Sequence, residues 1–313
     1  MNTKNSVKIH EFLKDYLPLI AIPITIYGAY KLFNRLIPGS HNLPKMEFKD
    51  KVVVITGASS GIGKALAYEL FARGAKLILL ARSVEKLSLI SEELRLLYPN
   101  NKNYPAFHYF DINDPENGPW DQIPKIDILI NNAGLSMRGS VADTPIEVHR
   151  QVMNVNFFGH VAVTRLLLPK ISPDGCIVAT SSVQGKVALP YRSSYSASKH
   201  ALQAFFDSLR CEHKNLHVLV VSAGYINTGF GSRALDADGK PVGVEDQNQK
   251  QGYSPQYAAV QILNAIRDRK SDFIMAATDA RFAILMKHFW PTLVNYLLYK
   301  RGTKDPWAQK KKD

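Results

Sequence analysis

Seven short apolar runs recur between residues 51 and 277, and most of them are rich in β-branched residues. They are KVVVIT (51–56), KLILLA (76–81), AFHYFDI (106–112), IDILI (126–130), CIVATS (176–181), HVLVVS (217–222) and DFIMAA (272–277). Runs of this kind predict strands that are buried on both faces of a sheet. Amphipathic stretches such as GKALAYELFARG (63–74) separate most of them. The alternation predicts one α/β domain, a doubly wound parallel sheet of about seven strands with helices on both faces.

Two further apolar segments lie outside this alternation. LPLIAIPITIYGAY (17–30) is uncharged and continues as KLFNRLI to residue 37. It is shorter than the ~20 residues of a spanning helix, and prolines interrupt it. We interpret residues 1–47 as a tail whose segment 17–37 is a membrane anchor; an amphipathic surface helix or a signal-peptide core is the alternative. In the C-terminal extension, 281–313, the stretch FAILMKHFWPTLVNYLLYK (282–300) predicts either a helix packed on the domain or a second membrane-facing patch.

The net charge of +12 is concentrated at the two ends. Residues 1–51 carry 8 Lys and Arg against 4 Asp and Glu, residues 281–313 carry 8 against 2, and the middle carries 23 against 21. A nucleic-acid binder needs its basic patch on the folded domain, so nucleic acid is not an expected partner. Basic ends beside apolar segments favour anionic lipid headgroups instead.

Terminal lysines and the cysteine content suggest where the protein resides. The chain ends KKKD, so Lys310 and Lys311 occupy the positions of a dilysine retrieval signal for the endoplasmic reticulum; a solvated basic tail is the alternative. We therefore expect a membrane-associated protein of the endoplasmic reticulum, with the peroxisomal membrane as the alternative. Two cysteines, Cys176 and Cys211, support neither a disulfide framework nor a zinc site, and no metal is expected.

A glycine-rich turn follows the first predicted strand. The stretch TGASSGIGKAL (56–66) leads directly into an amphipathic helix. Glycines let the backbone approach a pyrophosphate, and the free N–H groups of a helix N-terminus attract the anion. A nucleotide site is therefore expected here, formed by Thr56, Gly57, Ser59, Ser60, Gly61, Ile62 and Gly63.

The next two predicted strand ends bear on the choice of nucleotide. Sites that prefer NAD usually carry Asp or Glu after the second strand, but here that strand ends in LLARS (79–83). Arg82 would pair with a 2′-phosphate, so NADP(H) is favoured over NAD(H); a solvated surface arginine is the alternative. Asp111, after the third strand, is either an acceptor for the adenine amino group or a turn residue.

A tyrosine and a lysine stand four residues apart in SSYSASKHAL (193–202). On a helix, Tyr195 and Lys199 project from one side. The ammonium group is expected to lower the phenol pKa from its usual value near 10, which suits a general acid for a carbonyl. Ser181 and Ser182 end the fifth predicted strand, where a hydroxyl can hold the substrate oxygen.

Five ordered motifs together resemble the short-chain dehydrogenase/reductase family over roughly residues 48–280. They are TGASSGIG (56–63), NNAG (131–134), NVNFFG (154–159), TSSVQG (180–185) and YSASK (195–199). The resemblance implies a Rossmann-type fold and a Ser182 that orients and polarises the substrate carbonyl. It also implies that Tyr195 donates the proton, that Lys199 binds the nicotinamide ribose, and that Asn156 holds a water of the proton relay.

The same resemblance extends the cofactor site. It implies that Asn132, Ala133 and Gly134 line the cofactor and that Thr228 contacts the nicotinamide carboxamide; a purely structural Asn132 is the alternative. The sequence departs from the family at Ala223-Gly224, where Pro-Gly is usual. This change puts the rigidity of the loop after the sixth strand in doubt.

These features predict an oxidoreductase that moves a hydride between NADP(H) and a carbonyl or alcohol. The apolar, basic ends favour a lipophilic substrate of the steroid, retinoid or lipid ketone class. A cofactor-binding scaffold without catalysis is the alternative, although its catalytic residues are intact. Residues 229–252 are expected to form a substrate lid or a plain surface loop, and the resemblance allows a homo-oligomer formed through helices flanking the sheet.

Overall fold

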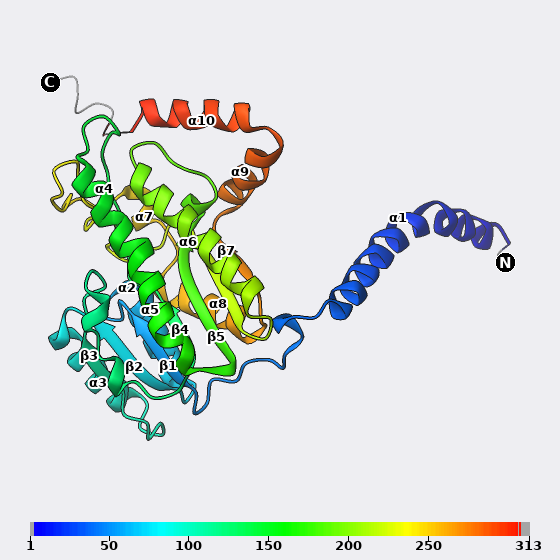
Figure 1. The fold of residues 1–313 in the computed structure, drawn as a ribbon. Helices are drawn as coiled ribbons and strands as arrows, with labels where there is room; N and C mark the ends of the chain where they lie inside the picture. Colours follow the sequence, from blue (N-terminus) through cyan, green and yellow to red (C-terminus); the bar gives the residue numbers. More distant parts are fainter. Residues whose placement is uncertain (1–2, 306, 308–313) are drawn as a thin grey trace.

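The computed structural model describes residues 3–305 and 307. Its centre is a seven-stranded, all-parallel sheet in the order β3-β2-β1-β4-β5-β6-β7 (Figure 1). The strands are β1 (Val52–Thr56), β2 (Lys76–Ala81), β3 (Ala106–Tyr109), β4 (Ile126–Asn131), β5 (Ile171–Ser182), β6 (His217–Ala223) and β7 (Asp272–Met275). Each predicted apolar run overlaps one strand, which confirms the predicted sheet, although β5 begins five residues before its run.

Helices cover both faces of the sheet. The helices α2 (Gly61–Ala72), α3 (Val84–Leu97) and α8 (Pro255–Arg267) pack on one face, and α4 (Ile146–Met153), α5 (Gly159–Leu167) and α6 (Ser193–Glu212) lie on the other. Alternate strand residues supply two separate cores. In β1, Val53 and Ile55 belong to the first core and Val54 to the second, because successive strand side chains point to opposite faces.

The strand register brings the chemically important residues together at the carboxyl ends of the central strands. Along β5 and β6 the pairing runs from Cys176 opposite His217 to Ser182 opposite Ala223. The chain order reverses between β1 and β4, which lie side by side at the centre of the sheet. In an open parallel sheet the ligand crevice lies beyond the carboxyl ends of the strands at this switch point. The motifs after β1, β4 and β5 therefore converge there.

The two ends of the chain are helical. One long helix, α1 (Thr3–Leu36), projects away from the domain, and α9 (Thr278–Phe289) and α10 (Pro291–Thr303) follow the last strand (Figure 1). Among the residues that the structure describes, no helix combines the length and the apolarity needed to cross a bilayer. Lys310 and Lys311, the predicted retrieval signal, lie outside the described residues.

Candidate active site

A cavity of about 530 Å³ lies at the carboxyl ends of the central strands. Its wall is formed by residues from the turn after β1, the ends of β2, β3 and β4, helix α6 and the segment after β6. Most of the predicted cofactor residues are part of this wall. They are Gly57, Ser59, Ser60, Gly61, Ile62, Arg82, Asp111, Asn132, Ala133, Gly134, Tyr195, Lys199 and Thr228.

The glycine-rich turn sets the N-terminus of α2 against this cavity. Gly61 begins the helix with φ +56°, a left-handed conformation that favours glycine. A Cβ on Gly63 would lie 2.6 Å from Nδ2 of Asn132 and still closer to the carbonyl oxygen of Gly57. Gly63 is therefore needed for close packing behind the wall, while Gly61 and Ile62 face the cavity.

Thr56 and Asn132 join the ends of β1 and β4. The Thr56 hydroxyl accepts hydrogen bonds from the backbone N–H groups of Asn132 (3.0 Å) and Ala133 (3.2 Å). In return, Nδ2 of Asn132 donates to the carbonyl oxygen of Thr56 at 3.1 Å. Thr56 is buried and is not part of the cavity wall, so it supports the site from behind. Asn132 has both of the predicted features, since it lines the cavity and ties two strands together.

The adenosine end of the expected site carries two cations. Arg82 and Lys86 both line the cavity, and both are exposed at its mouth. Sequence reasoning missed Lys86; the signal available was its place four residues after Arg82, in what the structure shows to be the first turn of α3. Asp111 lines the same cavity, and its Oδ1 accepts hydrogen bonds from the backbone N–H (3.0 Å) and the side chain (3.1 Å) of Asn113. Asp111 thus forms a turn within the wall.

Tyr195 and Lys199 share one face of α6, as their spacing predicts. The Lys199 ammonium nitrogen lies 5.9 Å from the centroid of the Tyr195 ring and donates to the carbonyl oxygen of Thr180 at 2.8 Å. Both side chains are buried. Burial lowers the pKa of Lys199 to about 7 and raises the pKa of Tyr195 above its usual value.

The expected lowering of the phenol pKa by Lys199 is therefore wrong. Removal of the phenolate from water raises the pKa of Tyr195, and this effect is the largest. A hydrogen bond from Ser182 and the positive charges of Arg138 and Arg192 lower the pKa, but by less. Lys199 is not among these causes, and its own burial discourages the charged form that the prediction requires. A phenol with a raised pKa stays protonated at neutral pH, which suits donation of a proton to a carbonyl.

The two serines at the end of β5 have separate roles. Ser182 interacts with the Tyr195 phenol, donates its hydroxyl to the carbonyl oxygen of Ala223 (3.2 Å) and accepts the backbone N–H of Gln184 (3.1 Å). Ser181 contributes to the cavity wall and donates its hydroxyl to the carbonyl oxygen of Lys199 at 3.2 Å. Ser182 thus lies against the phenol, whereas Ser181 braces α6.

Asn156 is buried in a π-helical turn, η4 (Asn154–Phe158), between α4 and α5. Such turns recur at functional sites because they reorient a side chain within a helix. The Asn156 Oδ1 accepts the backbone N–H of Leu135 at 2.8 Å, and Nδ2 donates to the Leu135 carbonyl oxygen (2.7 Å) and the Ser198 hydroxyl (3.0 Å). The amide therefore joins the segment after β4 to α6, behind the catalytic face.

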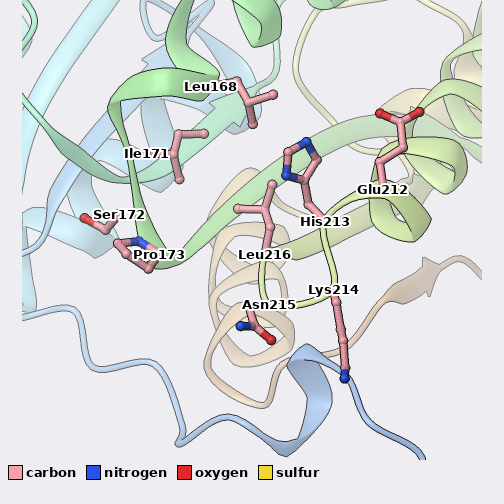
Figure 2. A pocket seen from close by; sticks show the side chains of 9 residues that line it. All are labelled: Leu168, Ile171, Ser172, Pro173, Glu212, His213, Lys214, Asn215 and Leu216. Atoms are coloured by element: carbon pink, nitrogen blue, oxygen red, sulfur yellow. The ribbon is translucent and has the colours of Figure 1, made fainter.

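A separate groove of about 470 Å³ lies at the opposite edge of the sheet (Figure 2). It is formed by the start of β5, the end of α6 and the chain leading into β6. Its lining residues are Leu168, Ile171, Ser172, Pro173, Glu212, His213, Lys214, Asn215 and Leu216. None of the predicted site residues lies there, so this groove is no part of the candidate active site.

The sheet order, the glycine turn and the Ser182–Tyr195–Lys199 arrangement define an α/β dinucleotide-dependent oxidoreductase. The family model described as short chain dehydrogenase matches residues 51–238. The chain is also 39% identical over 300 residues to Dehydrogenase/reductase SDR family member 7B of Xenopus tropicalis, covering 92% of this chain and 95% of the relative. The protein belongs to the short-chain dehydrogenase/reductase family, whose members act on CH–OH groups with NAD(P).

Solved structures agree with this assignment. A short chain dehydrogenase from Burkholderia cenocepacia in complex with NADP is 26% identical, with a TM-score of 0.67, over 81% of this chain and 99% of that one. A short chain dehydrogenase/reductase from Burkholderia phymatum in complex with NAD has a TM-score of 0.67 at 22% identity, over 79% of this chain and 96% of that one. At 22% identity, this second similarity supports the fold alone.

Proposed function

We propose that the protein is an NADP(H)-dependent oxidoreductase of a lipophilic carbonyl or alcohol, of the steroid, retinoid or lipid ketone class. The observation that carries the cofactor preference is the pair Arg82 and Lys86 in the cavity wall, without a carboxylate at the end of β2. Two cations there attract a 2′-phosphate. The α2 N-terminus and the close packing at Gly63 fit the pyrophosphate of the same nucleotide.

In this mechanism the bound nicotinamide supplies the hydride, and the chain supplies orientation and a proton. Ser182 donates a hydrogen bond to the substrate carbonyl oxygen beside the phenol. The phenol of Tyr195 then gives its proton to that oxygen as the alcohol forms. Lys199 lines the cofactor cavity next to Tyr195 and is proposed to hold the nicotinamide ribose. Asn156 keeps the segment after β4 fixed against α6.

The surroundings of Tyr195 support an apolar substrate. The phenol ring packs in a small cluster with Met137, Val152 and Leu235, and the Phe230 ring centroid lies 6.1 Å from its own. Met137, Leu235 and Phe230 come from loops beyond the strand ends. A hydrocarbon chain or ring system beside the reacting carbonyl would gain about 25 cal/mol for each Å² of apolar surface buried against them.

Replacing Arg82 with Ala tests the cofactor preference. We expect the Kd for NADPH to rise about 10- to 100-fold, because a charge-assisted hydrogen bond to the 2′-phosphate is lost, while the Kd for NADH stays unchanged. Reduced-nicotinamide fluorescence measures both constants on the full chain in detergent. Arg95→Ala, on the far turn of α3, is the matched control. Equal affinity of the wild type for both cofactors would reject Arg82 as the selector, and binding of neither would favour the scaffold alternative.

We also propose that the two ends hold the protein on a membrane, at the endoplasmic reticulum or, as the alternative, the peroxisome. Large apolar side chains of α1 are exposed, including Leu19, Ile22 and Ile26. The same is true of α9 and α10, where Phe289 and Trp290 are exposed beside lysines. Exposed apolar surface of this extent is typical of an interaction site.

Vesicle flotation tests this placement. The full chain is expected to float with vesicles of phosphatidylcholine and phosphatidylserine and to bind less tightly to phosphatidylcholine alone. The double variant Phe289→Ala, Trp290→Ala should reduce the bound fraction several-fold, while Leu96→Ala, an exposed leucine of α3, should not. A chain that stays with the unbound fraction on both lipids would refute membrane attachment.

A further inference from the structure

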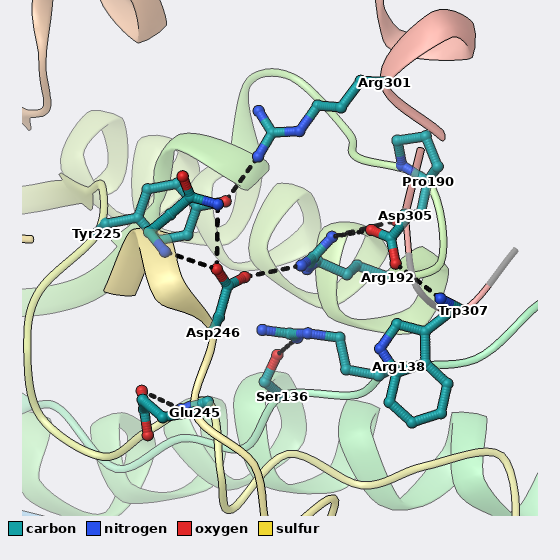
Figure 3. Close-up of polar contacts among 12 residues, drawn as sticks. Ser136, Arg138, Pro190, Arg192, Tyr225, Glu245, Asp246, Arg301, Asp305 and Trp307 are labelled. Carbon is teal, nitrogen blue, oxygen red and sulfur yellow. Dashed lines mark hydrogen bonds and ion pairs between the residues drawn. The ribbon is translucent and has the colours of Figure 1, made fainter. Parts of the chain in front are cut away.

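A second cavity, of about 610 Å³, is lined partly by the segment after β6, and Figure 3 shows polar contacts among several of the side chains around it. The segment after β6 borders both cavities. Phe230 and Gln249 face the first cavity, whereas their neighbours Gly231 and Asn248 face the second. Other lining residues are Arg138, Arg192, Arg301, Lys304, Asp305 and Trp307.

Two arginines are buried in this wall. Arg138 is 7% exposed and Arg192 is 5% exposed, although arginine is almost never buried without a partner. Both guanidinium groups act on the Tyr195 phenol, since both of their positive charges lower its pKa. The chain also brings both arginines near the proposed proton donor, since Arg192 precedes Tyr195 by three residues at the start of α6 and Met137, next to Arg138, packs against the Tyr195 ring.

Arg192 has its counter-ions within the protein. Its terminal nitrogens lie 3.2 Å from Oδ2 of Asp246 and 3.4 Å from Oδ2 of Asp305. Asp305 comes from the C-terminal extension, so the ion pair joins this extension to the start of α6 (Figure 3). Within the described part of the chain, Nε of Arg192 is buried and finds no hydrogen-bond partner.

Arg138 lacks such a counter-ion. One of its terminal nitrogens donates to the Ser136 hydroxyl (2.7 Å) and to the Met137 carbonyl oxygen (2.9 Å), and both acceptors are neutral. Among the side chains that the structure describes, no carboxylate forms an ion pair with it. Burial and the charge of Arg192 lower the pKa of Arg138 to about 10 against the opposing, longer-range charge of Asp246, so Arg138 remains protonated at neutral pH.

Asp246 and Glu245, two carboxylates of the second cavity, already have partners within the protein. Asp246 pairs with Arg192 and accepts the backbone N–H of Asn248 at 2.9 Å. Glu245 accepts the backbone N–H groups of Gly231 (3.3 Å) and Ser232 (3.2 Å). Further positive charge comes from the end of α10 and its following residue, since Arg301 and Lys304 also line the cavity. The pocket therefore has positive charge in excess, centred on a buried guanidinium.

We propose that Arg138 binds an anionic group, a carboxylate or a phosphate, that the carbonyl substrate itself carries. This inference rests on the proposed function and narrows its substrate class to an amphipathic ketone or aldehyde. Met137 packs beside Tyr195 and directly precedes Arg138, and Phe230 and Leu235 line the first cavity beside them. A substrate whose carbonyl meets the phenol can therefore lay its apolar part against Phe230 and Leu235. Its charged end then reaches the guanidinium, whose planar donors match both anions.

A matched pair of ketones tests the proposal. The full chain in nonionic detergent, saturated with NADPH, is given 9-oxodecanoic acid or its methyl ester, and NADPH oxidation is followed. We expect kcat/KM to be about 10- to 100-fold higher for the acid, the range for a hydrogen bond to a charged group. Arg138→Met should remove this preference, and Arg138→Lys should retain part of it. Lys214→Met, in the opposite groove of Figure 2, removes the same charge and should change nothing.

A second measurement does not depend on turnover. Inorganic phosphate is titrated into the NADPH-saturated protein, where the nucleotide blocks the first anion site, and binding is followed by the phosphorus resonance. Binding that Arg138→Met abolishes supports the anion site even if neither ketone is reduced, in which case only the proposed function fails. Equal rates for acid and ester, with phosphate binding unaffected by the substitution, overturn the anion site and leave the reductase intact.

The source of the anion is resolved by adding lipid. A preference for the acid in lipid-free detergent assigns the anion to the substrate. A dependence on Arg138 that arises only with vesicles containing phosphatidic acid would instead assign the guanidinium to a lipid headgroup and overturn the proposal. Thermal unfolding and NADPH affinity of Arg138→Met confirm that the variant is folded before either comparison is made.

Discussion

Replacing Tyr195 with Phe is expected to lower kcat by about 10²- to 10⁴-fold while NADPH binds as before, because general acid catalysis contributes that much. The phenylalanine keeps the ring packed among Met137, Val152 and Leu235 and removes only the hydroxyl. A fall in kcat of this size with an unchanged Kd for NADPH would therefore assign the effect to the lost proton transfer. The measurement is NADPH oxidation with a ketone that the wild type reduces, beside a fluorescence titration of the cofactor.

The pH dependence distinguishes the phenol from its neighbours. Burial raises the pKa of Tyr195, so reduction should persist above neutral pH, since the acid form is retained, and alcohol oxidation should increase as the pH rises. Tyr104→Phe, an exposed tyrosine far from the cavity, is the matched control and should leave kcat unchanged. A Tyr195→Phe variant with wild-type turnover would eliminate Tyr195 as the proton donor.

The sequence predicted the sheet and the cofactor turn well because both depend on local patterns. A fully buried parallel strand must be apolar throughout, and a helix that starts against a pyrophosphate needs glycine at a left-handed position such as Gly61. These requirements are visible in a few consecutive residues. The i and i+4 spacing likewise places Tyr195 and Lys199 on one face of a helix wherever that helix packs.

Burial could not be predicted in the same way. The direction of the Tyr195 pKa depends on how far the surrounding elements exclude water, and Lys199 loses its expected influence for the same reason. Arg138 carries no local signal at all, since LSMRGS resembles an ordinary polar loop. Its surroundings come from distant segments: the Leu235 carbonyl oxygen accepts the Arg138 backbone N–H at 2.6 Å, almost a hundred residues later in the chain, and Arg192 and Asp246 line the same cavity.

The loop after β6 shows how a departure from the family pattern is accommodated. Ala223 replaces the usual proline, yet the Gly224 N–H donates to the Met275 carbonyl oxygen at 2.8 Å and continues the pairing with β7. The Ala223 carbonyl oxygen accepts the Ser182 hydroxyl. Residues 229–252, expected as a lid or a surface loop, include the short helix α7 (Gln247–Lys250) and border both cavities.

Replacing Lys199 with Met is expected to weaken both cofactor binding and catalysis, unlike the change at Tyr195. The Lys199 side chain lines the cofactor cavity and lies beside the phenol, so its loss removes a proposed ribose contact and a hydrogen-bond donor near the reacting oxygen. We expect kcat/KM to fall about 10²- to 10³-fold and the Kd for NADPH to rise. A variant that lost turnover but bound NADPH as tightly as the wild type would contradict the ribose contact.

The stability of the same variant reports the protonation state of the lysine. The folded pKa of about 7 lies below the ordinary value of 10.5, so between these values the unfolded chain binds more protons than the folded chain. The free energy of unfolding of the wild type should therefore gain a contribution as the pH rises from 7 towards 10, because the cost of burying the charged form is relieved. Lys199→Met lacks this contribution, whereas Lys214→Met, at an exposed site, retains it. Urea unfolding without cofactor at pH 7 and pH 10 measures the difference, and parallel pH dependence in wild type and Lys199→Met would show that the lysine is not buried in its neutral form.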